Sequence, residues 1–201
     1  MAIQVAPEIE TLRKEIQKKY TEVASNPELT FHFHHGLPLA KILEYPEELM
    51  AELPPEAVES FAGVGNPFSL GEIAPGETVL DIGSGSGFDS MIAAKMVGPT
   101  GKVIGVDMTD AMLEKSRKTA KTLGLTQLEF KKGYAEELPV PDRSVDVVIS
   151  NGVINLTPDK SASFNEVFRV LKPGGRLYLA DIVVYKPVPD AVKEDVDLWT
   201  A

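Results

Sequence analysis

The residues with the clearest chemical pattern are an aspartate and three glycines in the segment TVLDIGSGSG, residues 78–87. Its apolar first half predicts a short buried strand that ends near Asp81. The alternating glycines Gly83, Gly85 and Gly87 predict a tight turn that lets a ligand approach the backbone closely. A helix after such a turn points its free N–H groups at the same place. The segment therefore predicts a nucleotide-like ligand site.

The charge beside this turn indicates which ligand it favours. No Lys or Arg occurs between residues 73 and 94, so Asp81 would repel a pyrophosphate and attract an ammonium or sulfonium group. The spacing GxGxG also departs from the dinucleotide pattern GxGxxG. A second acid, Asp107, ends the apolar segment 102–106 about 20 residues further on, where a carboxylate can bind both hydroxyls of a ribose. Adenosine with a positively charged tail describes S-adenosylmethionine better than NAD; the alternatives are a dinucleotide and a strand–turn–helix without a ligand.

Four longer motifs carry a family resemblance. They read DIGSGSG, VIGVDM, GYAEELPVPDRSVDVVISN and RVLKPGGRLYLADI, and they fall within residues 76–184. In combination they resemble the class I S-adenosylmethionine-dependent methyltransferases. GSGSGFD, VIGVDMT and FRVLKPGGRL, together with the segment GVGNP at 63–67, resemble the arsenite methyltransferase branch in particular. The resemblance implies a Rossmann-like, doubly wound α/β fold with a mainly parallel sheet, and methyl transfer from S-adenosylmethionine to a small-molecule acceptor.

The resemblance also implies the residues of the cofactor site. Those expected at the methionine end are Asp81, Gly83, Ser84, Gly85, Asn151 and Gly152. Asp107 is expected at the ribose, and those expected around the adenine are Met108, Tyr134, Ala135 and Glu136. Two of these have open alternatives: Met108 could simply belong to the core, and many relatives have Asp where Tyr134 stands.

The chain departs from the arsenite methyltransferases at the metalloid site. Those enzymes bind trivalent arsenic through cysteine thiolates, because arsenic(III) is soft and prefers soft ligands. Their cysteines would correspond to Val64 and Gly152, and this sequence contains no cysteine at all. We therefore expect an acceptor other than arsenite. The alternatives are a residual arsenite methyltransferase and a non-catalytic module that binds S-adenosylmethionine.

The segment TFHFHHG, residues 30–36, holds every histidine of the chain. His34 and His35 are candidates for a general base, because the pKa of histidine lies near neutrality. His32 is a candidate for the acceptor pocket, as is Asn155, whose alternative role is to cap the next helix. The other interpretations are a loop packed by its phenylalanines with solvated histidines, and a metal site, although no acid stands at ligand spacing. The expected set of metal ligands is empty.

Composition limits the class of protein. The 201 residues suit one domain, the net charge of −10 argues against a nucleic-acid partner, and no run of 18 apolar residues predicts a membrane span. With no signal-peptide pattern either, we expect a cytoplasmic protein.

The order of elements predicts two segments. Residues 1–70 are expected to form a helical cap, with an amphipathic helix over 7–25 that could close over the cofactor and short helices at 39–44, 46–53 and 55–61. Residues 71–201 are expected to form the methyltransferase core, with strands near 77–82, 102–107, 127–132, 145–150 and 175–184 and helices near 87–97, 109–123 and 159–171. The family sheet has seven strands, so we expect that the C-terminal strands are missing, or that a homodimer covers the open sheet edge.

Overall fold

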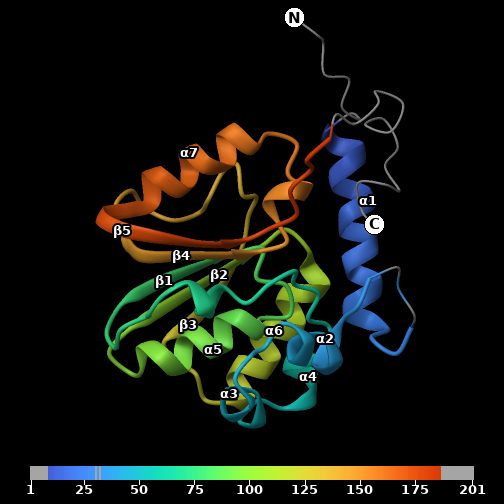
Figure 1. The fold of residues 1–201 in the computed structure, drawn as a ribbon, viewed down its shortest axis with the longest axis horizontal. Coiled ribbons are helices and arrows are strands. Elements are labelled where there is room, and N and C mark those ends of the chain that lie inside the picture. The colour runs from blue at the N-terminus through green and yellow to red at the C-terminus, as the bar shows by residue number, and fades with distance from the viewer. Residues whose placement is uncertain (1–8, 30, 32, 187–201) are drawn as a thin grey trace, which may run out of the picture.

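A computed structural model describes residues 9–29, 31 and 33–186. Its centre is one sheet of five parallel strands in the order β3-β2-β1-β4-β5 (Figure 1). The strands are β1 (Thr78–Ile82), β2 (Lys102–Asp107), β3 (Leu128–Lys132), β4 (Val145–Asn151) and β5 (Leu171–Ala180). This order starts at the centre and winds outward in both directions, which confirms the doubly wound α/β prediction.

Helices cover both faces of the sheet (Figure 1). Val79 of β1 shares one apolar cluster with α5 (Phe88–Val97) and α6 (Asp110–Thr122), whereas Leu80 shares the other with α7 (Lys160–Val170). Adjacent strand residues point to opposite faces, so a strand buried on both sides must be apolar at both. This explains the continuous apolar runs in the strand segments.

The N-terminal helices pack on the α5 side of the sheet. They are α1 (Ile9–Ser25), α2 (Gly36–Ile42), α3 (Glu47–Ala51) and α4 (Pro55–Val58), followed by the 3₁₀ helix η1 (Pro67–Leu70). α2 begins three residues before the predicted helix at 39–44, because Pro38 lies in its first turn, where no intrahelical N–H is needed. α3 and α4 are shorter than expected, since each ends within a few residues of the next proline or glycine.

The last strand is the largest correction to the predicted elements. The sequence predicted a strand over 175–184, and the structure has β5 over Leu171–Ala180. Leu171 pairs with Val145 at the start of β4, and Ala180 pairs with Asn151 at its end. Because β4 stops at Asn151, the apolar residues after Ala180 have no strand to pair with, and Ile182, Val183 and Val184 are exposed.

Candidate functional site

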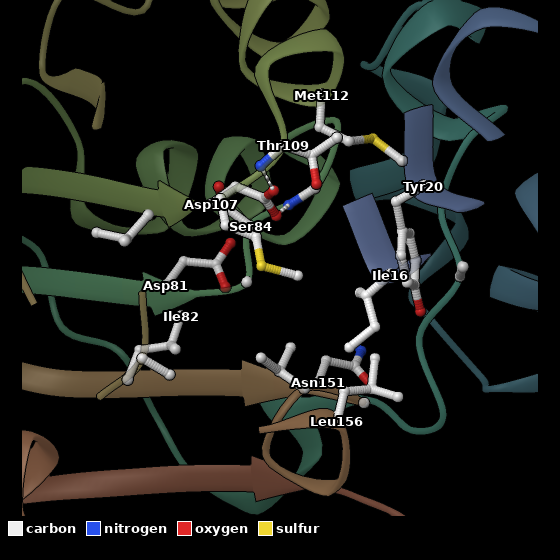
Figure 2. Close-up of a pocket in the computed structure, with 18 of the residues that line it drawn as sticks. Ile16, Tyr20, Asp81, Ile82, Ser84, Asp107, Thr109, Met112, Asn151 and Leu156 are labelled. Atoms are coloured by element: carbon white, nitrogen blue, oxygen red, sulfur yellow. Dashed lines mark hydrogen bonds between the residues drawn. The ribbon is translucent and has the colours of Figure 1, made fainter. Parts of the chain in front are cut away.

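A cavity opens at the carboxyl ends of β1, β2 and β4, where open α/β sheets bind their ligands (Figure 2). Its walls come from the glycine loop after β1, the end of β2, the turn after β3, the end of β4 and the inner face of α1. It is lined by all of the residues predicted to bind the cofactor: Asp81, Gly83, Ser84, Gly85, Asp107, Met108, Tyr134, Ala135, Glu136, Asn151 and Gly152.

The glycine loop is fixed to the neighbouring strand. The backbone N–H groups of Gly83 and Ser84 donate to the carbonyl of Val106, at 2.8 and 3.0 Å. Gly83 has a φ of +69°, and a Cβ there would stand 2.3 Å from a methyl carbon of Val153. A side chain at Gly83 would therefore be both strained and crowded.

Asp107 is held by the backbone on both sides. Its Oδ2 accepts from the N–H of Gly85 at 2.9 Å, and its Oδ1 accepts from the N–H of Thr109 at 2.7 Å (Figure 2). Burial raises the pKa of Asp107, and these two hydrogen bonds work against that rise. Each oxygen keeps a second lone pair, so a carboxylate fixed in this way can still accept from two hydroxyls.

Two further buried aspartates lie at the β1 end of the cavity. Asp81 accepts a hydrogen bond from Ser90 Oγ at 2.6 Å, and burial and the nearby Asp89 raise its pKa well above its usual value. Burial also raises the pKa of Asp89, to about 6, against hydrogen bonds from Tyr45 and Asn151. Like charges close together in a buried site disfavour ionisation, and a bound cation would favour it.

The far end of the cavity lies between α1 and the turn after β3. The Arg13 guanidinium carbon lies 4.1 Å from the ring centre of Tyr134, and an Nη of Arg13 lies 3.5 Å from a carboxylate oxygen of Glu136. Ser84 also lines the cavity, and its Oγ is buried without a hydrogen-bond partner in the described part of the chain. The cavity has planar apolar walls with polar edges, and the charged residues among its lining are mostly acidic. Such a lining fits an adenosyl group with a cationic tail.

Sequence reasoning missed several residues of the cavity wall. Ile16 and Tyr20 of α1 point into it (Figure 2); the sequence predicted that the helix over 7–25 could close over the cofactor, but it did not assign these two residues to the site. Burial, together with the charges of Asp107 and Asp181, raises the pKa of Tyr20 to about 12, so the phenol is neutral at physiological pH. The helical period indicated this face, but not that Leu12 and Val23 would enter the core while Ile16 and Tyr20 faced a ligand site.

The structure does not bring His34, His35 or Asn155 into this cavity. His34 is exposed, and the Nε2 of His35 lies 2.8 Å from the carbonyl of Pro27 beside a separate groove. His32 lies outside the described residues. Asn155 is not part of the cavity lining, and its backbone N–H faces the carboxylate of Asp181. Among the residues that the structure describes, no group of three His, Cys, Asp or Glu side chains could hold a metal ion.

Comparison with known proteins identifies the family. Residues 73–200 match the methyltransferase domain family. The chain belongs to this family. It is 51% identical to the arsenite methyltransferase of Halobacterium salinarum over 138 residues. This aligned region covers 69% of this chain and 35% of that protein. It is 38% identical to the ubiquinone/menaquinone biosynthesis C-methyltransferase UbiE of Salmonella arizonae over 127 residues. This aligned region covers 62% of this chain and 49% of that protein.

Solved structures agree with this assignment. An arsenic(III) S-adenosylmethionine methyltransferase from Chlamydomonas reinhardtii matches with a TM-score of 0.67 and 41% identity, over 73% of this chain and 51% of that one. A SAM-dependent methyltransferase from Aquifex aeolicus matches with a TM-score of 0.55 and 27% identity, over 73% and 79%. The chain is thus a class I methyltransferase of the arsenite methyltransferase-like branch, a family whose cofactor is S-adenosylmethionine, as the motifs predicted.

The match covers only part of the relatives. The chain spans 35% to 54% of the length of the arsenite methyltransferases that it matches. The two positions assigned to arsenic-binding cysteines lie together in space, because a Cβ on Gly152 would stand 3.3 Å from Cγ1 of Val64. In this chain the exposed side chain of Val64 lies beside Gly152, and of the two only Gly152 lines the cavity.

Proposed function

We propose that this chain binds S-adenosylmethionine in the cavity at the carboxyl ends of the strands and transfers its methyl group to a small-molecule acceptor. The observation that carries the proposal is the convergence of three carboxylates on one cavity beside a glycine loop: Asp81 and Asp89, which are buried, and Asp107, which is partly buried. A phosphate-bearing ligand would be repelled there, whereas a sulfonium and an ammonium would be stabilised.

Each wall of the cavity then has a role in binding the donor. Asp107 accepts from the ribose hydroxyls, and Met108, Tyr134, Ala135 and Glu136 surround the adenine. The other predicted residues surround the methionine end: Asp81, Gly83, Ser84, Gly85, Asn151 and Gly152. The bound donor supplies an activated methyl on a sulfonium leaving group.

The protein's part in methyl transfer is to align the reactants and to exclude water. Ile16 and Leu156 form apolar walls beside the methionine end (Figure 2), which keep bulk water from the reacting centre. A soft or already anionic acceptor needs no base. A hydroxyl or ammonium acceptor would need one, and for this role His34 and His35 remain predictions that require movement of the 30–36 segment. His32 and Asn155 remain proposed contacts of the acceptor, although Asn155 does not line the cavity.

Calorimetric titration with S-adenosylmethionine and S-adenosylhomocysteine, with NAD as the control ligand, tests the donor site. We expect binding of both adenosyl ligands and none of NAD. Asp107→Ala should weaken S-adenosylhomocysteine binding roughly 10- to 100-fold, because a hydrogen bond to a charged group contributes about 1.5–3 kcal/mol.

Asp110→Ala is the matched control for this titration. Asp110 lies three residues further on, is exposed, and pairs with Lys132 at 2.7 Å, so its removal should leave the affinity unchanged. An Asp107→Ala protein that still bound as tightly as the unaltered chain would show that the ribose lies elsewhere.

Arsenite is the second candidate acceptor, because the arsenite methyltransferases are at least 30% identical to this chain. The absence of cysteine from the 201 residues favours another acceptor. An acceptor screen that includes arsenite with an added thiol separates the two. Donor binding without transfer to any acceptor would support the third candidate, a non-catalytic binding module.

Several coarser expectations complete the proposal. We propose residues 1–70 as a cap on a core of residues 71–201, a cytoplasmic location, and no nucleic-acid partner, on the strength of the net charge of −10. No helix in the described ranges is long and apolar enough to cross a membrane.

β5 lies at an edge of the five-stranded sheet, and we propose that a second copy pairs there.

A further inference from the structure

The side-chain amide of Asn151 attaches the loop of residues 63–65 to the end of β4. Its Oδ1 accepts from the N–H groups of Val64 and Gly65, at 2.8 and 3.1 Å. Its Nδ2 lies 2.9 Å from the carbonyl of Gly65. The donor and the acceptor of the amide are therefore both used by one loop, although Asn151 faces the cavity (Figure 2).

Two buried residues fix the orientation of this amide. Nδ2 of Asn151 lies 3.1 Å from Oδ2 of Asp89 and 3.1 Å from the hydroxyl oxygen of Tyr45. The Tyr45 hydroxyl donates to Oδ1 of Asp89 at 2.7 Å, and it also lies 3.2 Å from the carbonyl oxygen of Gly65 in the loop. An amide turned the other way would place its oxygen against a carboxylate and its N–H groups against the loop N–H groups, so only the observed orientation satisfies all the partners.

The loop is packed closely against this network. A Cβ on Gly63 would stand 2.4 Å from Nδ2 of Asn151. The ring of Tyr45 packs against those of Phe61 and Phe88, with centroids 5.3 and 5.0 Å away, and these two rings also contact each other. Gly63 borders the cavity, whereas Tyr45 does not belong to the lining that the structure describes. The hydroxyl of Tyr45 can thus affect the cavity only through Asp89, Asn151 and the loop.

We infer that Tyr45 is a positioning residue that acts on the loop of residues 63–65, directly at Gly65 and through Asp89 and Asn151, and so holds Gly63 at the border of the cavity. The inference rests on the proposed function, because the cavity is a reaction site only if the donor binds there. It assigns the polar atoms of Asn151 to the loop rather than to direct hydrogen bonds with the donor. It also makes a residue of the N-terminal cap part of the support for the reacting centre.

The test is the variant Tyr45→Phe, which keeps the ring packing and removes only the hydroxyl. Hydrogen exchange of the Val64 and Gly65 amides, followed by NMR, should become about tenfold faster, because their shared acceptor is less firmly held. The affinity for S-adenosylhomocysteine should stay within about twofold of the unaltered chain. Tyr178→Phe is the matched control: its hydroxyl also bonds to a backbone carbonyl, that of Glu72 at 3.0 Å, and its loss should not change exchange at Val64 and Gly65.

A second readout separates positioning from general loosening of the structure. The ratio of the affinities for S-adenosylmethionine and S-adenosylhomocysteine isolates the effect of the sulfonium charge. Asp89 is faced by the Tyr45 hydroxyl, the Asn151 amide and the nearby Asp81 carboxylate. Removal of the Tyr45 hydroxyl withdraws a hydrogen bond that lowers the pKa of Asp89, so the pH at which this ratio rises should shift upward.

The outcomes are distinguishable. Unchanged exchange at Val64 and Gly65, or an unshifted pH profile, would overturn the positioning role while the proposed function stands. A loss of S-adenosylhomocysteine affinity as large as that of Asp107→Ala would make Tyr45 part of the donor site instead. No binding by the unaltered chain would overturn the proposed function itself. If Tyr45→Phe fails to fold, Asn151→Asp takes its place, because the carboxylate keeps the acceptor for the two loop N–H groups and removes the donor.

Discussion

At the scale of single residues, the cavity is defined by carboxylates that are costly to bury. Asp81, Asp89 and Asp107 are each less than half exposed, and burial raises the pKa of all three. Without a cation, the folded chain holds protons at these groups more tightly than the unfolded chain does. The cost of keeping them ionised is reduced when a positive ligand enters, which couples donor binding to stability.

The pH dependence of stability follows from Asp89. Its pKa of about 6 in the folded chain lies above the usual 3.8, so its contribution to stability is complete below the unfolded value and is lost as the pH rises through about 6. We expect the free energy of unfolding, measured by urea titration without ligand, to fall between these two pH values. Asp89→Asn, which cannot ionise, should show a smaller fall, and an equal fall in both proteins would assign the effect to other groups.

Alanine substitutions at two glycines with positive φ separate the cost of backbone strain from the cost of steric crowding. Gly83→Ala should destabilise the chain by more than about 3 kcal/mol and abolish donor binding, because the new Cβ meets Val153 at 2.3 Å. Gly124→Ala is the control, with a similar φ of +67° and no heavy atom within 4 Å of the added Cβ. It should cost only the strain of a left-handed conformation, about 1–2 kcal/mol. Thermal unfolding and S-adenosylhomocysteine titration of both variants check this, and equal losses would contradict the crowding argument.

At the scale of elements, α1 is the N-terminal wall of the cavity. It contributes Arg13, Ile16 and Tyr20 to the lining. It is tied to the core by few polar contacts, among them Gln17 Nε2 to the carbonyl of Met108 at 3.0 Å. Met108 adjoins the proposed ribose ligand Asp107, so this hydrogen bond joins the helix to the cofactor site.

Gln17→Ala should weaken donor binding roughly 2- to 10-fold, since a neutral hydrogen bond contributes about 0.5–1.5 kcal/mol. The loss should appear as faster dissociation in stopped-flow measurements, because a looser helix opens the cavity more often. Lys18→Ala is the control from the same helix: its exposed side chain pairs with Glu15 at 3.7 Å and with no other acid of the described residues, and its removal should not change dissociation. Equal rates in all three proteins would show that α1 does not gate the cavity.

At the scale of the whole molecule, exposed apolar side chains lie near one edge of the sheet. β5 forms an outer strand, and the exposed apolar residues near it are Phe164, Phe168, Ile182, Val183, Val184 and Tyr185. An unpaired strand edge beside exposed apolar groups favours pairing with another chain. The net charge of −10 opposes association at low ionic strength.

We therefore expect a dimer that grows with protein concentration and with added salt. Sedimentation velocity should show the shift, and hydrogen exchange along β5 should slow as the dimer forms. Exchange along β3, the opposite edge strand, serves as the internal control and should stay constant. A monomer at every concentration and salt level would contradict pairing along β5.

Much of the fold followed from local patterns in the sequence. The boundaries of β1 to β4 and of α5 to α7 were predicted to within a residue or two, because apolar runs, caps and glycine turns are local signals. β5 was the exception: the run RLYLADIVV gives no sign of where pairing stops, and the length of β4 ends the strand at Ala180.

The sequence by itself predicted the glycine loop beside an acid, the second acid Asp107 and the family, because each of these signals depends on residue types at short spacing. Only the tertiary structure decided that Tyr45 and Asn151, 106 residues apart, meet at Asp89, and that Tyr20 of α1 faces the cavity. It also decided that His34 and His35 lie away from that cavity, although their chemistry suits a base. Contacts between distant segments depend on how whole helices pack against the sheet, and no local period in the chain records that packing.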